Sequence, residues 1–290
     1  MTAALLDLEH IGVRKAVGAF LLRTDDGWAL VDCGPSSTAH VLEHRLREHG
    51  RSVGDLRHLQ LTHIHLDHAG AAGLLVQRNP ELRVHVSAIG APHVVDPSRL
   101  EASARRLYGE AFDALWGEIV PVPEENVDVL GDEVAGLACF PAPGHASHQV
   151  CFVGPDGTAY PGDAAGVRIE PGRHVVPYAP PPDIDVEAWH RTLDELEARE
   201  PARIALPHYG VFEEVTEHVA QLRRRLDLWA GRVESGVPVE QFVATAEAEL
   251  AADGEGGTDY YSSHSPWVPS YLGLARYWAK RREAGVTPRT

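Results

Sequence analysis

The sequence predicts an α/β sandwich. Short apolar runs alternate with turn signals in the first 62 residues, and strand-like and helix-like segments then alternate as far as residue 206. From Glu213 onward the apolar spacing is almost entirely helical. Strands that alternate with helices are typical of layered α/β proteins and argue against an all-helical fold. We therefore expect one sandwich domain, residues 1–212, followed by a helical extension, residues 213–290, that packs on it.

The first half of the domain is expected to begin with strands 16–22 and 28–31, joined by a Thr-Asp-Asp-Gly turn. Helix 38–49 follows, with Ser36 or Ser37 near its start and Gly50 at its end. The next elements are strand 58–61, helix 71–77 and strand 82–86. Residues 88–126 then interrupt the rhythm, because four prolines surround a helical stretch at 99–116. We interpret this segment as a helical insertion packed over one edge of the core.

The second half is expected to contain strands 134–140, 150–153, 158–160 and 203–206. A loop at residues 169–185 carries three consecutive prolines, which stiffen an extended segment and exclude a central strand. Helix 186–196 follows, because Val186, Trp189, Leu193 and Leu196 fall on one helical face. Three amphipathic helices are expected beyond Glu213.

Charge and cysteine content restrict the class of protein. The chain has 26 basic and 42 acidic residues among 290, a formal charge of −16, which disfavours nucleic acid and anionic membranes as partners. The N-terminal residues lack an apolar run behind a basic start, and the three cysteines form no C-x-x-C pair. We therefore expect a cytoplasmic protein that acts on a small molecule. The aromatic-rich C-terminal segments also allow a homodimer.

The histidines give the clearest chemical signal. His63, His65, Asp67 and His68 stand within six residues, directly after an apolar strand. In an extended loop His63, His65 and Asp67 point the same way, and a turn at Asp67 can bring in His68. Imidazoles and a carboxylate at this spacing suit Zn²⁺, or iron and manganese where more oxygen ligands are present. The sequence therefore predicts a metal site at the end of this strand.

At this point the sequence resembles the metallo-β-lactamase fold superfamily, whose signature is His-x-His-x-Asp-His after a strand. Four further positions match the family in the right order: Asp32 in an Asp-Cys-Gly segment, His145 after Pro-Gly, Asp163 in Pro-Gly-Asp, and His208 in Leu-Pro-His-Tyr-Gly. The branch it is most similar to contains glyoxalase II and the lactonases. That branch carries Gly-His-Thr-x-Gly-His around the third histidine, whereas this chain has Gly-His-Ala-Ser-His-Gln.

The resemblance implies an αββα sandwich with two divalent metal ions, zinc being the first expectation and iron or manganese the alternatives. The first metal would be held by His63, His65 and His145. The second would be held by Asp67, His68 and His208. Asp163 would bridge the two metals, and Asp32 would support the metal loop by accepting N–H groups. Asp67 would also serve as the catalytic carboxylate that takes or passes a proton.

The substrate pocket is predicted less directly. Because loop 169–185 follows Asp163, we expect it to pass over the metals and to contribute His174 and Tyr178. His148 orients a ligand, faces the pocket or lies on the surface. Tyr209, next to a predicted ligand, either donates a hydrogen bond to an oxyanion or packs in the core. Helix 99–116, Tyr260-Tyr261 and Trp267 either close the cavity or form a dimer face, although such aromatic residues more often belong to the core.

Together these features predict a hydrolase in which a metal-bound hydroxide attacks a small ester, thioester or lactone, with a neutral or apolar substrate favoured over a polyanion. Three alternatives stay open at this stage. The first is a mono-iron dioxygenase acting on a persulfide-like substrate. The second is a phosphodiesterase or nuclease. The third is an inactive binding protein of the same fold.

Overall fold

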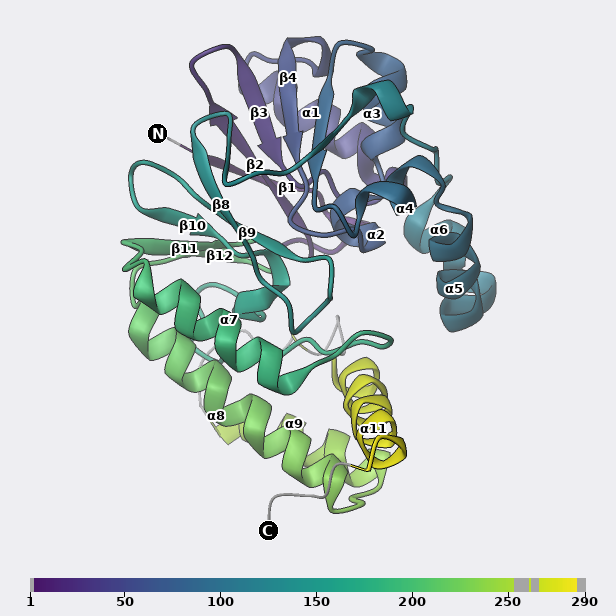
Figure 1. Cartoon of the computed structure of the whole chain (residues 1–290), viewed down its shortest axis with the longest axis vertical. Coiled ribbons are helices and arrows are strands. Elements are labelled where there is room, and N and C mark those ends of the chain that lie inside the picture. The colour runs from purple at the N-terminus through teal and green to yellow at the C-terminus, as the bar shows by residue number, and fades with distance from the viewer. Residues whose placement is uncertain (1–2, 253–260, 262–265, 286–290) are drawn as a thin grey trace.

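The computed structural model describes residues 3–252, 261 and 266–285. Two six-stranded sheets pack face to face, and helices cover both outer faces (Figure 1). This arrangement confirms the predicted αββα sandwich with helices at the C-terminal end. No helix within the described ranges combines the length and the apolar character needed to cross a membrane.

The first sheet has the order β1-β2-β3-β4-β5-β6. Its strands are β1 (Ala4–Asp7), β2 (Gly18–Arg23), β3 (Trp28–Val31), β4 (Leu56–Gln60), β5 (Arg83–Val86) and β6 (Val127–Val129). The second sheet has the order β12-β11-β10-β9-β8-β7. Its strands are β7 (Glu133–Val134), β8 (Leu137–Pro141), β9 (Val150–Val153), β10 (Thr158–Tyr160), β11 (Arg203–Leu206) and β12 (Gly210–Phe212).

The helices follow the same layering. Those in the first half are α1 (Ala39–Glu48), α2 (Leu66–Ala69), α3 (Ala72–Arg78), α4 (Ala91–Val95), α5 (Ser98–Tyr108) and α6 (Phe112–Trp116). Those in the second half are α7 (Val186–Ala198), α8 (Val215–Glu234), α9 (Val239–Ala252) and α11 (Trp267–Glu283). Helices α1 and α3 pack on the first sheet, whereas α7, α8, α9 and α11 lie on the side of the second sheet (Figure 1).

Three apolar layers hold the sandwich together. The layer between the sheets includes Phe20 and Val31 from the first sheet and Phe152 and Tyr160 from the second. Two larger layers fill the space between each sheet and its helices. Removal of these side chains from water is the main source of stability, at roughly 25 cal/mol per Å² of apolar surface.

Strand direction places the functional loops at one edge of the sandwich. Strands β3 and β4 are parallel, and so are β10 and β11. The loops after their carboxyl ends therefore emerge together. The loop before β9 joins them, because β9 runs antiparallel to β10.

Several predicted elements differ from those observed. The predicted strand 134–140 is a hairpin of β7 and β8, because Ala135 and Gly136 turn the chain with φ of 47° and 79°. The predicted helix 99–116 ends as α5 at Tyr108 and resumes as α6, since Gly109 takes a positive φ of 55°. Strands β1, β6 and β12 were not expected from the sequence.

The insertion at residues 88–126 lies beside the loop that follows β4. Phe112 and Trp116 of α6 are buried against Leu66 of that loop. Helix α5 itself buries none of its residues fully, and it extends outward at the side of the molecule (Figure 1). The insertion therefore packs on the predicted metal loop with α6 and presents α5 to the space in front of it.

Candidate metal centre

Four loops bring seven predicted metal ligands together at the edge of the sandwich. His63, His65, Asp67 and His68 follow β4, His145 precedes β9, Asp163 follows β10 and His208 follows β11. Six of them form two groups, and within each group the ligand atoms lie within 4.8 Å of one another. The first group is His63, His65 and His145, and the second is Asp67, His68 and His208. We call these seven residues the histidine–aspartate cluster.

The first group is a set of three imidazoles. Nδ1 of His65 lies 3.0 Å from Nε2 of His63 and 3.0 Å from Nε2 of His145. Oδ2 of Asp163 lies 3.5 Å from the same nitrogen of His145. Three imidazole nitrogens and one carboxylate oxygen thus surround a single point.

The second group mixes imidazoles and carboxylates. Nε2 of His68 lies 3.3 Å from Nε2 of His208, and Oδ2 of Asp67 lies 3.8 and 3.6 Å from these two nitrogens. Oδ1 of Asp163 lies 3.3 Å from His68 and 3.5 Å from His208. The two oxygens of Asp163 therefore face different groups, as a bridging carboxylate must.

The donors fit two divalent cations. Both Asp163 oxygens are buried, and within the described part of the chain neither accepts a hydrogen bond of good geometry. A buried carboxylate without such partners is costly unless a cation satisfies it. Five imidazoles and two carboxylates are the ligand types of zinc, iron and manganese sites.

Asp32 supports the second group. Its Oδ1 accepts the backbone N–H of Thr62 at 2.8 Å, and its Oδ2 lies 2.9 Å from Nδ1 of His68. Asp32 has a φ of 58°, in the left-handed region that aspartate tolerates better than most residues. A carboxylate behind a histidine fixes the imidazole tautomer and turns its other nitrogen toward the metal position.

The outer nitrogens of three other histidines are also held. Nδ1 of His63 lies 3.1 Å from Oγ1 of Thr62, Nδ1 of His145 lies 2.7 Å from the carbonyl of Tyr178, and Nδ1 of His208 lies 2.6 Å from the carbonyl of Ala16. These contacts leave the Nε2 atoms for the centre of the cluster.

The charges within the cluster are complementary. Burial lowers the pKa of His63 and of His65, with neighbouring imidazoles adding to the effect. Burial also lowers the pKa of His68, but the carboxylates of Asp163, Asp67 and Asp32 outweigh it, so the net shift is upward. The first group therefore holds neutral imidazoles that need not lose a proton before they bind a cation.

A cavity of about 460 Å³ opens in front of the cluster, and we call it the cluster cavity. Its inner wall contains His65, Asp67 and His148. The other walls are supplied by α5 and by the proline-rich loop, with Pro180, Pro181 and Pro182 among the lining residues. This loop was expected to pass over the metals; its Tyr178 and three prolines line the cavity.

Two tyrosines meet where these walls approach each other. Tyr108 and Tyr178 both line the cavity here, and burial raises the pKa of Tyr108 to about 12, with the charge of Asp67 adding to the shift. The Tyr178 ring stacks on His145 at a centroid distance of 6.2 Å and meets His208 edge-on at 6.4 Å. Tyr178 therefore contacts one ligand from each group.

The predicted pocket residues divide into two sets. His148 and Tyr178 line the cluster cavity, whereas His174 and Tyr209 do not. His174 is buried beside Tyr261, whose hydroxyl donates to the His174 carbonyl at 2.6 Å. Tyr209 packs in the apolar layer of the second sheet, with its ring against Gly18, a position that matches the core alternative.

The C-terminal aromatic residues also do not line this cavity. Tyr261 and Trp267 belong to the apolar layer of the second sheet, and Tyr260 lies outside the described residues. The cavity residues that sequence reasoning missed are Tyr108 and Arg106 of α5, together with His93. The apolar spacing of the insertion was visible in the sequence, but the direction of its faces was not.

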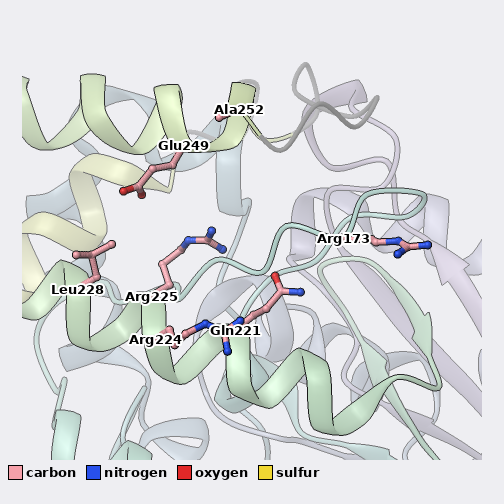
Figure 2. Close-up of a pocket in the computed structure, with 7 residues that line it drawn as sticks. All are labelled: Arg173, Gln221, Arg224, Arg225, Leu228, Glu249 and Ala252. Carbon is pink, nitrogen blue, oxygen red and sulfur yellow. The ribbon is translucent and has the colours of Figure 1, made fainter.

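A second cavity, of about 640 Å³, lies away from the cluster (Figure 2). Arg224, Arg225 and Leu228 of α8 line it together with Glu249 of α9 and Arg173. It contains none of the seven cluster residues, and a guanidinium N–H of Arg225 donates to the carbonyl of Val175. The cluster cavity, although smaller, is therefore the one that the predicted metal ligands line.

Comparison with known proteins agrees with this geometry. A family model described as the metallo-beta-lactamase superfamily matches residues 14–208. No curated protein sequence matches the chain. Three solved structures show its fold, each at low sequence identity. A metallo-beta-lactamase family protein from Thermus thermophilus has a TM-score of 0.68 and 21% identity, covering 99% of this chain and 95% of its own.

The second, an archaeal metallo-beta-lactamase superfamily protein from Sulfolobus tokodaii, has a TM-score of 0.64 and 18% identity, covering 94% of this chain and 97% of its own. The third, TTHA1623 in a di-iron-bound form, has a TM-score of 0.55 and 22% identity, covering 71% of this chain and 93% of its own.

Proposed function

The chain belongs to the metallo-beta-lactamase superfamily, and from that premise we propose that it is a metal-dependent hydrolase of a small ester, thioester or lactone. The observation that carries the proposal is the bridging position of Asp163, whose two buried oxygens face two separate groups of ligand atoms. Such a layout is suited to two metals that act on one carbonyl group.

In this proposal His63, His65 and His145 hold one metal, Asp67, His68 and His208 hold the other, and Asp163 bridges them. Two divalent ions, when bound, lower the pKa of a water molecule toward neutrality and polarise the carbonyl group that it attacks. We expect zinc first, with iron or manganese as the alternatives.

The protein's own groups position the substrate. Tyr108 and Tyr178 present hydroxyls next to Asp67, and either hydroxyl can donate a hydrogen bond to a carbonyl oxygen that gains negative charge. The proline-rich loop and Trp116 give the cavity apolar walls that exclude water from the reacting bond.

Asp67 is the cluster carboxylate that also lines the cavity. Burial raises its pKa, but His68 and His208 lower it more, so the carboxyl group is ionised at neutral pH. Since its Oδ2 faces His68 and His208, we propose that Oδ1 accepts the proton released when water attacks the carbonyl group and passes that proton to the leaving group.

Metal analysis and a substrate panel test the proposal. Protein purified without chelators should contain close to two metal ions per chain, and Asp163→Asn should contain fewer. The control is His44→Ala, because His44 is an exposed residue of α1 that pairs with Glu48 and lies outside the cluster. Metal-loaded protein should hydrolyse at least one class among esters, thioesters and lactones, and failure with all three would overturn the proposal.

The same analysis discriminates the main alternative. One iron per chain with oxygen consumption on a persulfide would replace hydrolysis by the dioxygenase function. The cytoplasmic location and the homodimer stay predictions, and light scattering of the purified protein measures the oligomeric state.

A further inference from the structure

Helix α5 presents a two-part surface to the cluster cavity. Its apolar side chains Leu100, Ala104 and Leu107 line the cavity at helical spacing. Arg99 and Arg106 line the same cavity, and their separation of seven residues places them on the same side of the helix. The cavity wall is therefore an apolar stripe with a basic edge.

The two arginines have no partner in direct contact in the part of the chain that the structure describes: neither forms an ion pair or a hydrogen bond there. Arg105, between them in sequence, contacts Glu101 at 2.8 Å and Asp113 at 2.9 Å. In a chain with a formal charge of −16, acids to neutralise a guanidinium are abundant. The basic edge therefore stays available to a ligand.

The acids near the basic edge are already engaged. Asp96 accepts the backbone N–H of Ser98, a contact that lowers its pKa more than Arg99 does. Asp183 lines the cavity from the proline-rich loop and accepts a hydrogen bond from Ser147 at 2.6 Å. His93 is a further cationic or neutral group among the lining residues.

The helix also sets a length. Tyr108, at the inner end of α5, lines the cavity together with Asp67 and Tyr178. Arg106 precedes it by two residues and Arg99 by nine, so they lie roughly 3 and 13 Å farther along the helix axis at 1.5 Å per residue. An extended chain of about eight carbons spans roughly 8–9 Å at about 1.2 Å per bond, and the long arginine side chains supply the remaining reach.

We propose that the substrate carries an anionic group, a carboxylate or a phosphate, at the end of an apolar chain, and that Arg99 and Arg106 bind this group. This inference rests on the proposed function, in which the metals hold the reacting end of the substrate. The substrate class is then an anionic acyl ester or thioester, which replaces the neutral or apolar substrate expected from the sequence.

A metal-anchored probe tests the binding without turnover. Thiolates bind zinc, so 8-mercaptooctanoate and 8-mercapto-1-octanol can both bind zinc-loaded protein, and they differ at the far end. Calorimetry should show the acid binding more tightly than the alcohol, by about five-fold for each arginine engaged. The difference should shrink as salt is raised. A third probe, 8-mercaptooctyl phosphate, distinguishes a carboxylate from a phosphate. The probe whose anionic group matches that of the natural substrate should bind more tightly.

Variants assign the effect to the basic edge. Arg99→Ala with Arg106→Ala should bring the acid and the alcohol to equal affinity, with unchanged zinc content and melting temperature. Arg105→Ala is the matched control on the same helix and should keep the preference. Equal binding of acid and alcohol to the wild type, or an equal loss of preference in Arg105→Ala, would overturn the proposal.

Hydrolysis assays separate this proposal from the proposed function. Thioesters with matched acyl chains, one ending in a carboxylate and the other in an amide, should differ in kcat/KM in the same direction as the probes. If neither is hydrolysed but the probe preference depends on the arginines, the hydrolase function fails and the anion site stands. If both are hydrolysed equally and the probes show no preference, the function stands and the anion site fails.

Discussion

Replacing Asp32 by asparagine tests how the fold prepares the second metal position. Asp32 accepts the backbone N–H of Thr62 with one oxygen and faces Nδ1 of His68 with the other. Its backbone has a φ of 58°, which asparagine tolerates, so the substitution should leave the chain path intact. The change therefore removes one charge and one acceptor.

The expected loss follows from the tautomer of His68. If the new amide oxygen keeps Thr62, the amide NH₂ faces Nδ1 of His68 and drives the imidazole proton to Nε2. That nitrogen is the one 3.3 Å from Asp163, and once protonated it cannot bind a metal. If the amide flips, a buried N–H of Thr62 loses its acceptor, which costs about 1–3 kcal/mol. Loss of such a supporting carboxylate lowers metal affinity about 10- to 100-fold.

Zinc titration against a competing chelator measures the effect. In Asp32→Asn the binding step assigned to Asp67, His68 and His208 should shift by that factor, and the step assigned to His63, His65 and His145 should change little. Asp26→Asn is a matched control, because Asp26 contacts His58 at the same distance of 2.9 Å outside the cluster. Equal weakening of both steps, or no weakening, would refute the role given to Asp32.

Three further predictions address catalysis, acid stability and metal linkage. Tyr178→Phe keeps the ring contacts with His145 and His208 but removes the hydroxyl, so kcat should fall at least ten-fold with unchanged metal content, and an unchanged kcat would argue against an oxyanion role. Burial lowers the pKa of His218 to about 4, below the value near 6.5 expected in the unfolded chain, so the unfolded chain binds the proton first and stability falls as pH drops from 6.5 toward 4. Between pH 7.5 and 5.0 this residue should lower the free energy of unfolding, measured with urea, by about 2 kcal/mol. The variant His218→Gln should lose less stability over the same pH range by that amount, and an identical loss in the variant would contradict the assignment. Removing metal with a chelator should lower the melting temperature, since free metal at 100 times its Kd stabilises the folded state by about 2.7 kcal/mol per site, whereas Asp163→Asn should respond much less, and an equal response in both proteins would count against the bridge.

The cluster was predictable from sequence because each ligand lies next to a strand end. His63, His65, Asp67 and His68 lie close together in the chain, so local spacing alone places them near one another. His208 is distant in sequence, and it could be placed only through the resemblance to a known family. The structure then brings its Nε2 to 3.3 Å from that of His68.

The pocket was harder to predict for a physical reason. Tyr209 adjoins a ligand in sequence, yet its side chain enters the apolar layer behind the second sheet, so adjacency did not indicate direction. Tyr108 is far in the chain from every cluster ligand, and it reaches the cluster only because α6 anchors the insertion beside Leu66. Such a contact depends on tertiary packing, which one sequence without its structure does not specify.

The predicted metal ligands lie on the sandwich, whereas the residues that would contact the far end of a substrate lie on the insertion. Substrate specificity can therefore change separately from metal binding. The cluster ligands adjoin strands and are held by contacts such as Asp32 to His68 and His145 to the carbonyl of Tyr178. The side chains that would meet the far end of a substrate stand on α5, a helix with no fully buried residue. Exposed positions of this kind tolerate substitution with little loss of stability. Changes at Arg99 or Arg106 should therefore alter KM and substrate preference while metal content and the melting temperature stay constant, whereas changes at His68 should alter all of them together.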